Sequence, residues 1–191
     1  MSSFEYVMVI VSIILGLGIA TLLRGAIQAI RANSGSTLGG LHGLWVAILL
    51  LQYVQLWSAR WYGGGREDWP ALVLLAYLLV PIIYFAQAEL LFPSARQAVD
   101  LDDYFLDNRV PFFGLAAAGH IATAAGRMLF YDPSSPMWIT GRIAVIVVGL
   151  LSVYAAVCVA LMWTRKRVMH LAWAVLYLLI LIAQLQALAV G

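Results

Sequence analysis

Charged residues are scarce in this chain, and their scarcity excludes a soluble globular domain. Only 10% of its 191 residues are Asp, Glu, Lys or Arg, whereas 64% are hydrophobic. A soluble domain carries about 25% charged residues, so this chain has too little polar surface to face water on all sides. The sequence also lacks the alternating strands of an outer-membrane barrel. The composition therefore predicts an all-α fold, a polytopic transmembrane helical bundle.

Several kinds of chemistry lack the residues that they require. The single cysteine, Cys158, lies inside an apolar run and can form neither an intramolecular disulfide nor a thiolate metal cluster. No HExxH, phosphate-binding or Ser-His-Asp pattern is present, and Lys166 lies in an expected loop. The net charge of +2 provides no basic surface for nucleic acid. We therefore expect a non-enzymatic protein with no metal and no nucleic-acid partner.

Long apolar runs, separated by segments such as RANSGSTLGG, GGGRED and YDPSSP, predict six membrane spans in one domain. A span needs about 20 mainly apolar residues. We expect the single transmembrane domain 1–191 to hold spans at about 5–29, 41–61, 69–91, 110–130, 137–163 and 169–190. The fourth span is the least hydrophobic, so a five-span alternative stays open. No basic segment precedes the first span, which indicates a retained helix rather than a cleaved signal peptide.

The basic residues are distributed unevenly between the two sides of the expected bundle. The connections after the first, third and fifth spans hold seven Lys and Arg residues, and the other two connections hold four. Loops rich in Lys and Arg stay in the cytoplasm. We therefore expect both termini on the outer side, which is the periplasm for a bacterial inner membrane.

A weak internal similarity suggests a duplication. The segment 18–25 resembles 120–127 at an offset of 102 residues, and 77–83 resembles 177–183 at an offset of 100. Each unit would hold three helices, and an odd number inverts the second unit, which gives a 3+3 inverted repeat. Chance matching of runs rich in leucine and alanine is the alternative.

Small residues spaced by four form ridges on the first and fourth spans. Such ridges let helix backbones approach closely inside a membrane. We expect the two spans to cross at the centre with Gly16 against Ala118, so that Ala118→Leu forces them apart. The ridge residues are Ser12, Gly16 and Ala20 on the first span, and Gly114, Ala118, Ala122 and Gly126 on the fourth.

Polar residues inside the spans form a candidate ligand site. An ionisable group at membrane depth costs roughly 2.5–3.5 kcal/mol on insertion scales and usually faces protein or a wet cavity. We expect His120 to face polar groups of neighbouring spans, either as a proton or ligand site or as a neutral, hydrogen-bonded structural residue. The candidate ligand and polar-path residues are His120, Thr123, Arg127, Gln52, Gln55, Tyr77, Tyr84, Tyr177 and Gln184.

Two further groups of polar residues lie near the expected inner side. The segment VDLDDYFLDNR holds four aspartates without the spacing or the central glycine of an EF-hand, so we expect a solvated, helix-capping loop. His42 and His170 begin the second and last spans at one depth, where two histidines could ligate haem. Nothing else nearby supports a haem, and we expect no cofactor.

Three stretches, FEYVMVIVSIILGLGIATLLRG, LWVAILLLQYVQLW and LDDYFLDNRVPFFGL, resemble an uncharacterised family of small bacterial polytopic integral membrane proteins. The resemblance implies a bacterial origin and an inner-membrane location. No activity is known for the family, so the resemblance implies no catalytic or ligand residues. The last two spans match the family only in being hydrophobic.

These observations favour an integral inner-membrane protein that binds or passes a small solute or ion between two three-helix halves. The alternative is a structural or accessory subunit whose partners, besides lipid, are copies of itself or subunits of a larger membrane complex. A histidine-ligated haem redox protein is a third hypothesis. The first function requires polar residues that converge inside one protomer, and the second requires an exposed face that partners bury.

Overall fold

The described part of the chain folds into helices and contains no strand, which confirms the all-α prediction. The computed structural model describes residues 2–31, 39–61, 69–93, 100–129 and 141–190. The helices are α1 (Ser3–Arg31), α2 (Gly40–Trp61), α3 (Ala71–Leu90), α4 (Leu101–Asp107), α5 (Arg109–Leu129), α6 (Gly141–Met162) and α7 (Arg167–Val190). The long helices fall on the expected segments, and residues 130 and 137–140 of the expected fourth and fifth spans lie outside the described residues. The short helix α4 was not expected.

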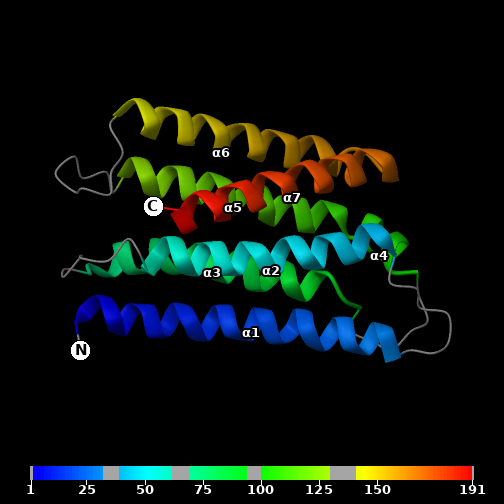
Figure 1. Cartoon of the computed structure of the whole chain (residues 1–191), viewed down its shortest axis with the longest axis horizontal. Coiled ribbons are helices and arrows are strands. Elements are labelled where there is room, and N and C mark those ends of the chain that lie inside the picture. The colour runs from blue at the N-terminus through cyan, green and yellow to red at the C-terminus, as the bar shows by residue number, and fades with distance from the viewer. Residues whose placement is uncertain (1, 32–38, 62–68, 94–99, 130–140, 191) are drawn as a thin grey trace.

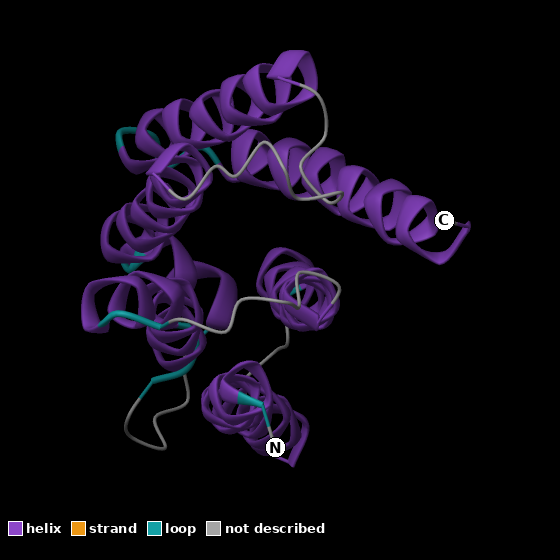
Figure 2. Ribbon diagram, turned by 90° about the vertical axis from the view of Figure 1, so that its left-hand side faces the viewer, coloured by secondary structure: helices purple, strands orange, loops and turns teal. Residues whose placement is uncertain are grey.

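The long helices lie side by side and run in alternating directions, with α4 at one end of the bundle (Figure 1). We call this end the α4 end. Helix α1 begins and α7 finishes at the opposite end. Helix α1 packs on α2 and α3, α3 packs on α5, α5 packs on α6, and α7 packs on α2. The two halves of the chain therefore meet where α3 contacts α5 and where α7 contacts α2. Viewed from the end of the bundle, α1 is seen nearly along its axis and α7 obliquely (Figure 2).

Among the described residues, five helices are long and apolar enough to cross a membrane. These segments are Ser3–Arg31, Gly40–Ala59, Ala71–Leu90, Val145–Met162 and Arg167–Gln186. Helix α5 is not among them, because its alanines, glycines and polar residues make it less apolar than the others. Length and composition thus support a membrane protein with five candidate spans, and a sixth span through α5 is not confirmed by them.

Helix α1 is held by a seam of buried residues that, from Met8 to Gly25, are spaced alternately by three and four, with Val7 beside its first member. The buried residues are Val7, Met8, Val11, Leu15, Gly18, Leu22 and Gly25. This spacing is typical of helices that pack as in a coiled coil. A Cβ atom at Gly18 would overlap the Tyr53 ring of α2, and one at Gly25 would overlap the Phe92 ring. These two close approaches therefore require glycine.

The predicted contact between Gly16 and Ala118 is wrong. Both residues are exposed, and nothing lies within 4 Å of the position that a Cβ would take at Gly16. Ser12 and Ala20 are exposed as well, so the whole predicted ridge of α1 faces outward. The buried face of α1 is chosen by its larger side chains, Leu15 and Leu22 among them, because these gain the most from packing.

On α5 the predicted ridge also fails to meet α1, because α5 packs on α3 and α6 instead. Gly114 faces Met162 of α6, whose Cε atom would lie 3.6 Å from a Cβ at this position. Ala122 and Gly126 are partly buried, and a Cβ at Gly126 would meet open space. Ala118→Leu is therefore not expected to force helices apart, because Ala118 is exposed and the larger side chain would lie on the outer surface.

The inverted repeat is not confirmed. Helix α1 packs extensively on both α2 and α3. In the second half, α5 packs extensively on α6, whereas α7 lies against α2 of the first half.

Helix α4 begins with a strong cap and is partly embedded in the bundle. The Asp100 carboxylate accepts hydrogen bonds from the backbone N–H groups of Asp102 (2.8 Å) and Asp103 (3.3 Å), which satisfies two of the donors that a helix start leaves unpaired. The Tyr104 hydroxyl donates to the Phe92 carbonyl at 3.2 Å. Burial raises the pKa of Tyr104, so its hydroxyl stays protonated and remains a donor.

Asp102 departs from the solvated loop that the sequence suggested, because its side chain is fully buried. One carboxylate oxygen accepts from the backbone N–H of His42 at 2.7 Å, in the first turn of α2, and the other pairs with Arg167 at the start of α7. A negative charge at a helix N-terminus is stabilised by the helix dipole. A Cβ at Gly39 would overlap this carboxylate, so glycine is required there. Asp102 therefore joins α2, α4 and α7.

We predict that Gly18→Ala destabilises the protein while Gly16→Ala does not. The new methyl group at position 18 has no space beside Tyr53, and overpacking of this kind costs about 1–3 kcal/mol. The methyl group at position 16 meets open space and adds helix propensity, because glycine is about 1 kcal/mol less favourable than alanine in a helix. Thermal unfolding of both variants in detergent compares the two sites. Equal melting temperatures would contradict the observed seam.

We also predict that Asp102→Ala destabilises the protein more than Asp107→Ala. Asp102→Ala removes a buried cap and the partner of Arg167, which together contribute about 2–3 kcal/mol. Asp107 pairs with Arg165, but their side chains are 61% and 64% exposed, and such pairs contribute less than about 1 kcal/mol. The unfolding midpoint in a denaturant series measures both losses. A larger loss for Asp107→Ala would refute the assignment.

Candidate functional site

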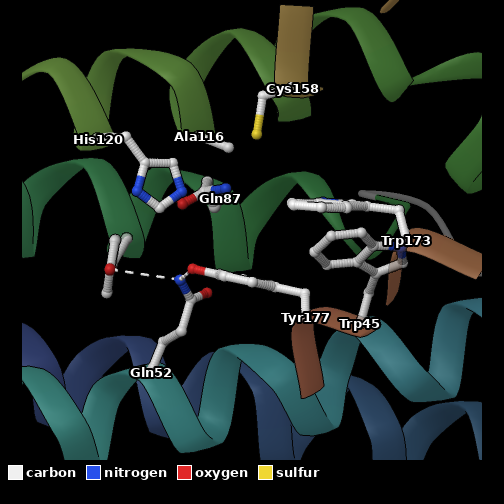
Figure 3. A pocket seen from close by; sticks show the side chains of 9 residues that line it. Trp45, Gln52, Gln87, Ala116, His120, Cys158, Trp173 and Tyr177 are labelled. Carbon is white, nitrogen blue, oxygen red and sulfur yellow. Dashed lines mark hydrogen bonds between the residues drawn. The ribbon is translucent and has the colours of Figure 1, made fainter. Parts of the chain in front are cut away.

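Four helices each contribute a polar side chain to one cluster inside the bundle. Gln52 comes from α2, Tyr84 from α3, His120 from α5 and Tyr177 from α7, and all four line the same cavity. Figure 3 shows Gln52, His120 and Tyr177 converging from three sides. The first two residues belong to the first half of the chain and the other two to the second half, so the cluster lies where the halves meet.

The Gln52 amide joins this cluster by hydrogen bonds. Its Nε2 atom donates to the Tyr177 hydroxyl at 2.7 Å (Figure 3). The same atom donates more weakly to the Tyr84 hydroxyl at 3.4 Å. Both Gln52 and Tyr177 are 6% exposed. Because a hydroxyl that accepts a hydrogen bond keeps its own proton for donation, the Tyr177 hydroxyl can still donate to a further group.

His120 faces protein and packs among aromatic rings. Its ring centroid lies 5.5 Å from that of Tyr154 on α6 and 6.1 Å from that of Tyr177. Within the described residues, its imidazole makes contacts with rings but no hydrogen bond. A neutral imidazole has one donor and one acceptor nitrogen, so both remain available to a small molecule in the cavity.

The cavity itself is small and has neutral walls. Its volume is about 10 Å³, close to the least that holds one water molecule. The remaining wall residues are Trp45, Gln87, Ala116, Cys158 and Trp173. None of these lining residues is Asp, Glu, Lys or Arg.

The aromatic residues beside the cavity form a compact cluster toward the α4 end. The Trp173 ring stacks on the Tyr177 ring with a centroid distance of 5.7 Å and an interplanar angle of 9°. Trp45 contacts Phe105 (5.8 Å), Phe112 (5.2 Å) and Phe113 (5.3 Å). Pairs of this kind contribute about 0.5–1.5 kcal/mol each beyond their burial. The cluster separates the cavity from Asp102 and Arg167.

The other predicted polar-path residues lie apart from the cavity. Gln55 of α2 donates to Gln184 of α7 at 2.6 Å, a second bond between the same two helices. Tyr77 contacts Met8 and the Trp69 ring. Thr123 donates to the Gly119 carbonyl of its own helix at 2.8 Å. The Arg127 side chain lies outside the described residues.

His42 and His170 are fully buried at the α4 end. The Nε2 atom of His42 bonds to the Leu91 carbonyl at 2.8 Å, and that of His170 bonds to the Thr164 carbonyl at 2.9 Å. A carbonyl only accepts, so in the neutral rings Nε2 carries the proton and only Nδ1 offers a lone pair. Both Nδ1 atoms have no partner among the described residues. The expectation that the chain carries no cofactor stays a prediction.

Several cavity residues were not predicted from the sequence. Trp45 and Trp173 each lie three residues after a buried histidine, His42 or His170, near the start of a helix that begins at the α4 end. This shared spacing was the available signal that α2 and α7 present similar faces. Cys158 and Ala116 carry no such signal, because apolar residues of their kind occur on every face of these helices.

The chain matches no protein-family model, no curated protein and no solved structure.

Proposed function

We propose that the protein is an integral membrane protein that binds a small solute or ion at the cluster of Gln52, Tyr84, His120 and Tyr177, and passes it between its two three-helix halves. The observation that carries this proposal is the convergence of polar side chains from four helices on one cavity. Polar groups inside a membrane are costly and are usually functional or paired. Here the His120 imidazole keeps unused hydrogen-bonding capacity.

A sixth span through α5 is part of this proposal. Its 21 residues correspond to about 31 Å of helix, close to the roughly 30 Å hydrocarbon core. Helix α5 lies alongside the apolar helices, with both ends of the chain at one end of the bundle (Figure 1). An even number of spans fits this placement. The lower hydropathy of α5 is explained by a location between α3 and α6, where it faces protein more than lipid.

We also propose a bacterial inner membrane as the location, with both termini in the periplasm. The proposal is supported by the excess of Lys and Arg in the segments at the α4 end, including 165–167. The resemblance to small bacterial membrane proteins points the same way. An ancestral duplication remains a hypothesis without support from the packing of the helices.

The rival function is that of an accessory subunit in a larger membrane complex. It is favoured by the outward face of α1, where Ser12, Gly16 and Ala20 leave room for another helix to approach. Lipid also covers such a face. The cavity favours the first function, because a purely structural subunit has no need of a space lined by polar groups.

We predict that a reporter fused after residue 191 is active only on the periplasmic side. Alkaline phosphatase at this position should be active, and a fluorescent protein that matures only in the cytoplasm should be dark. Six crossings put both termini on one side, and the Lys and Arg residues at the α4 end put that side in the periplasm. The opposite pattern would overturn the periplasmic placement of the C-terminus. Fusions after residues 97 and 140, on either side of α5, then test its crossing: reporters on opposite sides show that α5 spans the membrane, and reporters on the same side show that it does not.

We predict that His120→Ala strongly reduces transport in proteoliposomes while it lowers stability only modestly. Purified protein is assayed in parallel for permeability to protons, potassium ions, water and ammonia. Loss of the ring contacts of His120 should cost about 1 kcal/mol of stability. The permeability that the wild type confers should fall at least about tenfold, which corresponds to about 1.4 kcal/mol in the barrier.

The matched control is Ser152→Ala. The Ser152 side chain is exposed and bonds only to the Val148 carbonyl of its own helix, so its removal should change neither stability nor permeability. If His120→Ala lowers the melting temperature but leaves permeability intact, His120 is a structural residue and the proposed site is wrong. Wild-type liposomes no more permeable than empty ones would favour the accessory-subunit function.

A further inference from the structure

The size of the cavity restricts what the site can hold. A volume of about 10 Å³ accommodates one water molecule at most. The bond of 2.7 Å between Gln52 and Tyr177 closes one side of this space, and the stacked rings of Trp173 and Tyr177 close another. A ligand of more than one non-hydrogen atom would have to separate these helices.

The charge of the walls restricts the ligand further. The cavity is lined by amide, phenol, imidazole, thiol and indole groups, none of which is an anion in its ordinary state. The buried carboxylate of Asp102 is engaged with Arg167 and the start of α2, beyond the aromatic cluster around Trp45. A metal cation in the cavity would thus lose its hydration shell without gaining a counter-charge, and such a transfer is strongly unfavourable.

The hydrogen-bonding groups fit a molecule that both donates and accepts. His120 offers one donor and one acceptor nitrogen, and the Tyr177 hydroxyl keeps a proton to donate because its oxygen accepts from Gln52. The Gln52 amide oxygen is an additional acceptor. Water and ammonia combine donors and an acceptor on a single non-hydrogen atom.

We propose, on the basis of the function proposed above, that the site takes a neutral molecule with a single non-hydrogen atom, water or ammonia, and excludes metal cations. The molecule lies between the His120 imidazole and the Tyr177 hydroxyl. Selectivity comes from two features. The cavity is too small for a hydrated ion, and its walls carry no negative charge to compensate a cation for the loss of its hydration shell.

Two alanines on α5 supply a matched test of this proposal. Ala116 lines the cavity, whereas Ala118 is exposed on the outer surface of the same helix. Ala116→Leu fills the cavity, and Ala118→Leu adds the same volume outside it. Proteoliposomes of each variant are assayed for osmotic water permeability by light scattering, for ammonia entry by an internal pH dye, and for potassium and sodium currents. Ala116→Val, with a smaller side chain, replaces Ala116→Leu if the latter does not fold.

The wild type should raise water or ammonia permeability and carry no potassium or sodium current. Filling position 116 should return that permeability to the level of empty liposomes, and Ala118→Leu should leave it unchanged. The water and ammonia arms identify which of the two molecules passes. A cation current that Ala116→Leu abolishes would overturn the choice of ligand while leaving the proposed function standing. If Ala116→Leu keeps the water or ammonia permeability of the wild type, the molecule does not pass through this cavity. No permeability in any arm would overturn both proposals.

Discussion

The hydrogen bond from Gln52 to the Tyr177 hydroxyl connects the two halves of the chain at the cavity. It joins α2 of the first half to α7 of the second, and it forms a wall of the cavity that His120 faces. Lipid supplies no hydrophobic drive for helices to associate, so packing and interhelical hydrogen bonds must hold them together. The bond between Gln55 and Gln184 lies on the same pair of helices. Without these bonds, α7 would be held near the cavity only by apolar contacts, since its pair between Arg167 and Asp102 lies at the α4 end, and the cavity would lose its defined shape.

Charged side chains and neutral polar side chains occupy different parts of the bundle. Ionised groups pair at the α4 end, where Asp102 and Asp107 meet Arg167 and Arg165. The interior between the helices is lined by neutral polar and aromatic groups, with the aromatic cluster around Trp45 between the two regions. An unpaired charge in a medium of low dielectric is expensive, so this separation lets polar chemistry exist inside the bundle at small cost. It also gives the cavity its proposed preference for neutral molecules.

The sequence indicated the long helices well, because an apolar run of the right length has few other stable structures in a membrane. It also pointed to Gln52, Tyr84 and Tyr177, which line one cavity with His120. It placed Gln55 there as well, although Gln55 bonds to Gln184 instead, and it did not indicate the Tyr154 ring that packs against His120. It failed for the contact between Gly16 and Ala118, because spacing by four appears on every face of a helix rich in small residues. The burial of Asp102 could not be read either: α2 and α7 lie far from α4 in sequence, and only the folded chain brings their first turns to its carboxylate.

A double-mutant cycle on Gln52 and Tyr177 measures whether their hydrogen bond joins α2 to α7. The free energy of unfolding is measured for the wild type, Gln52→Leu, Tyr177→Phe and the double variant, each of which changes little in volume. A direct bond between helices predicts a coupling energy of about 0.6 kcal/mol, the average for such bonds in membranes, and of at most about 1.7 kcal/mol. Additive losses, with a coupling energy indistinguishable from zero, would show that α2 and α7 are not joined at this point and would contradict the account.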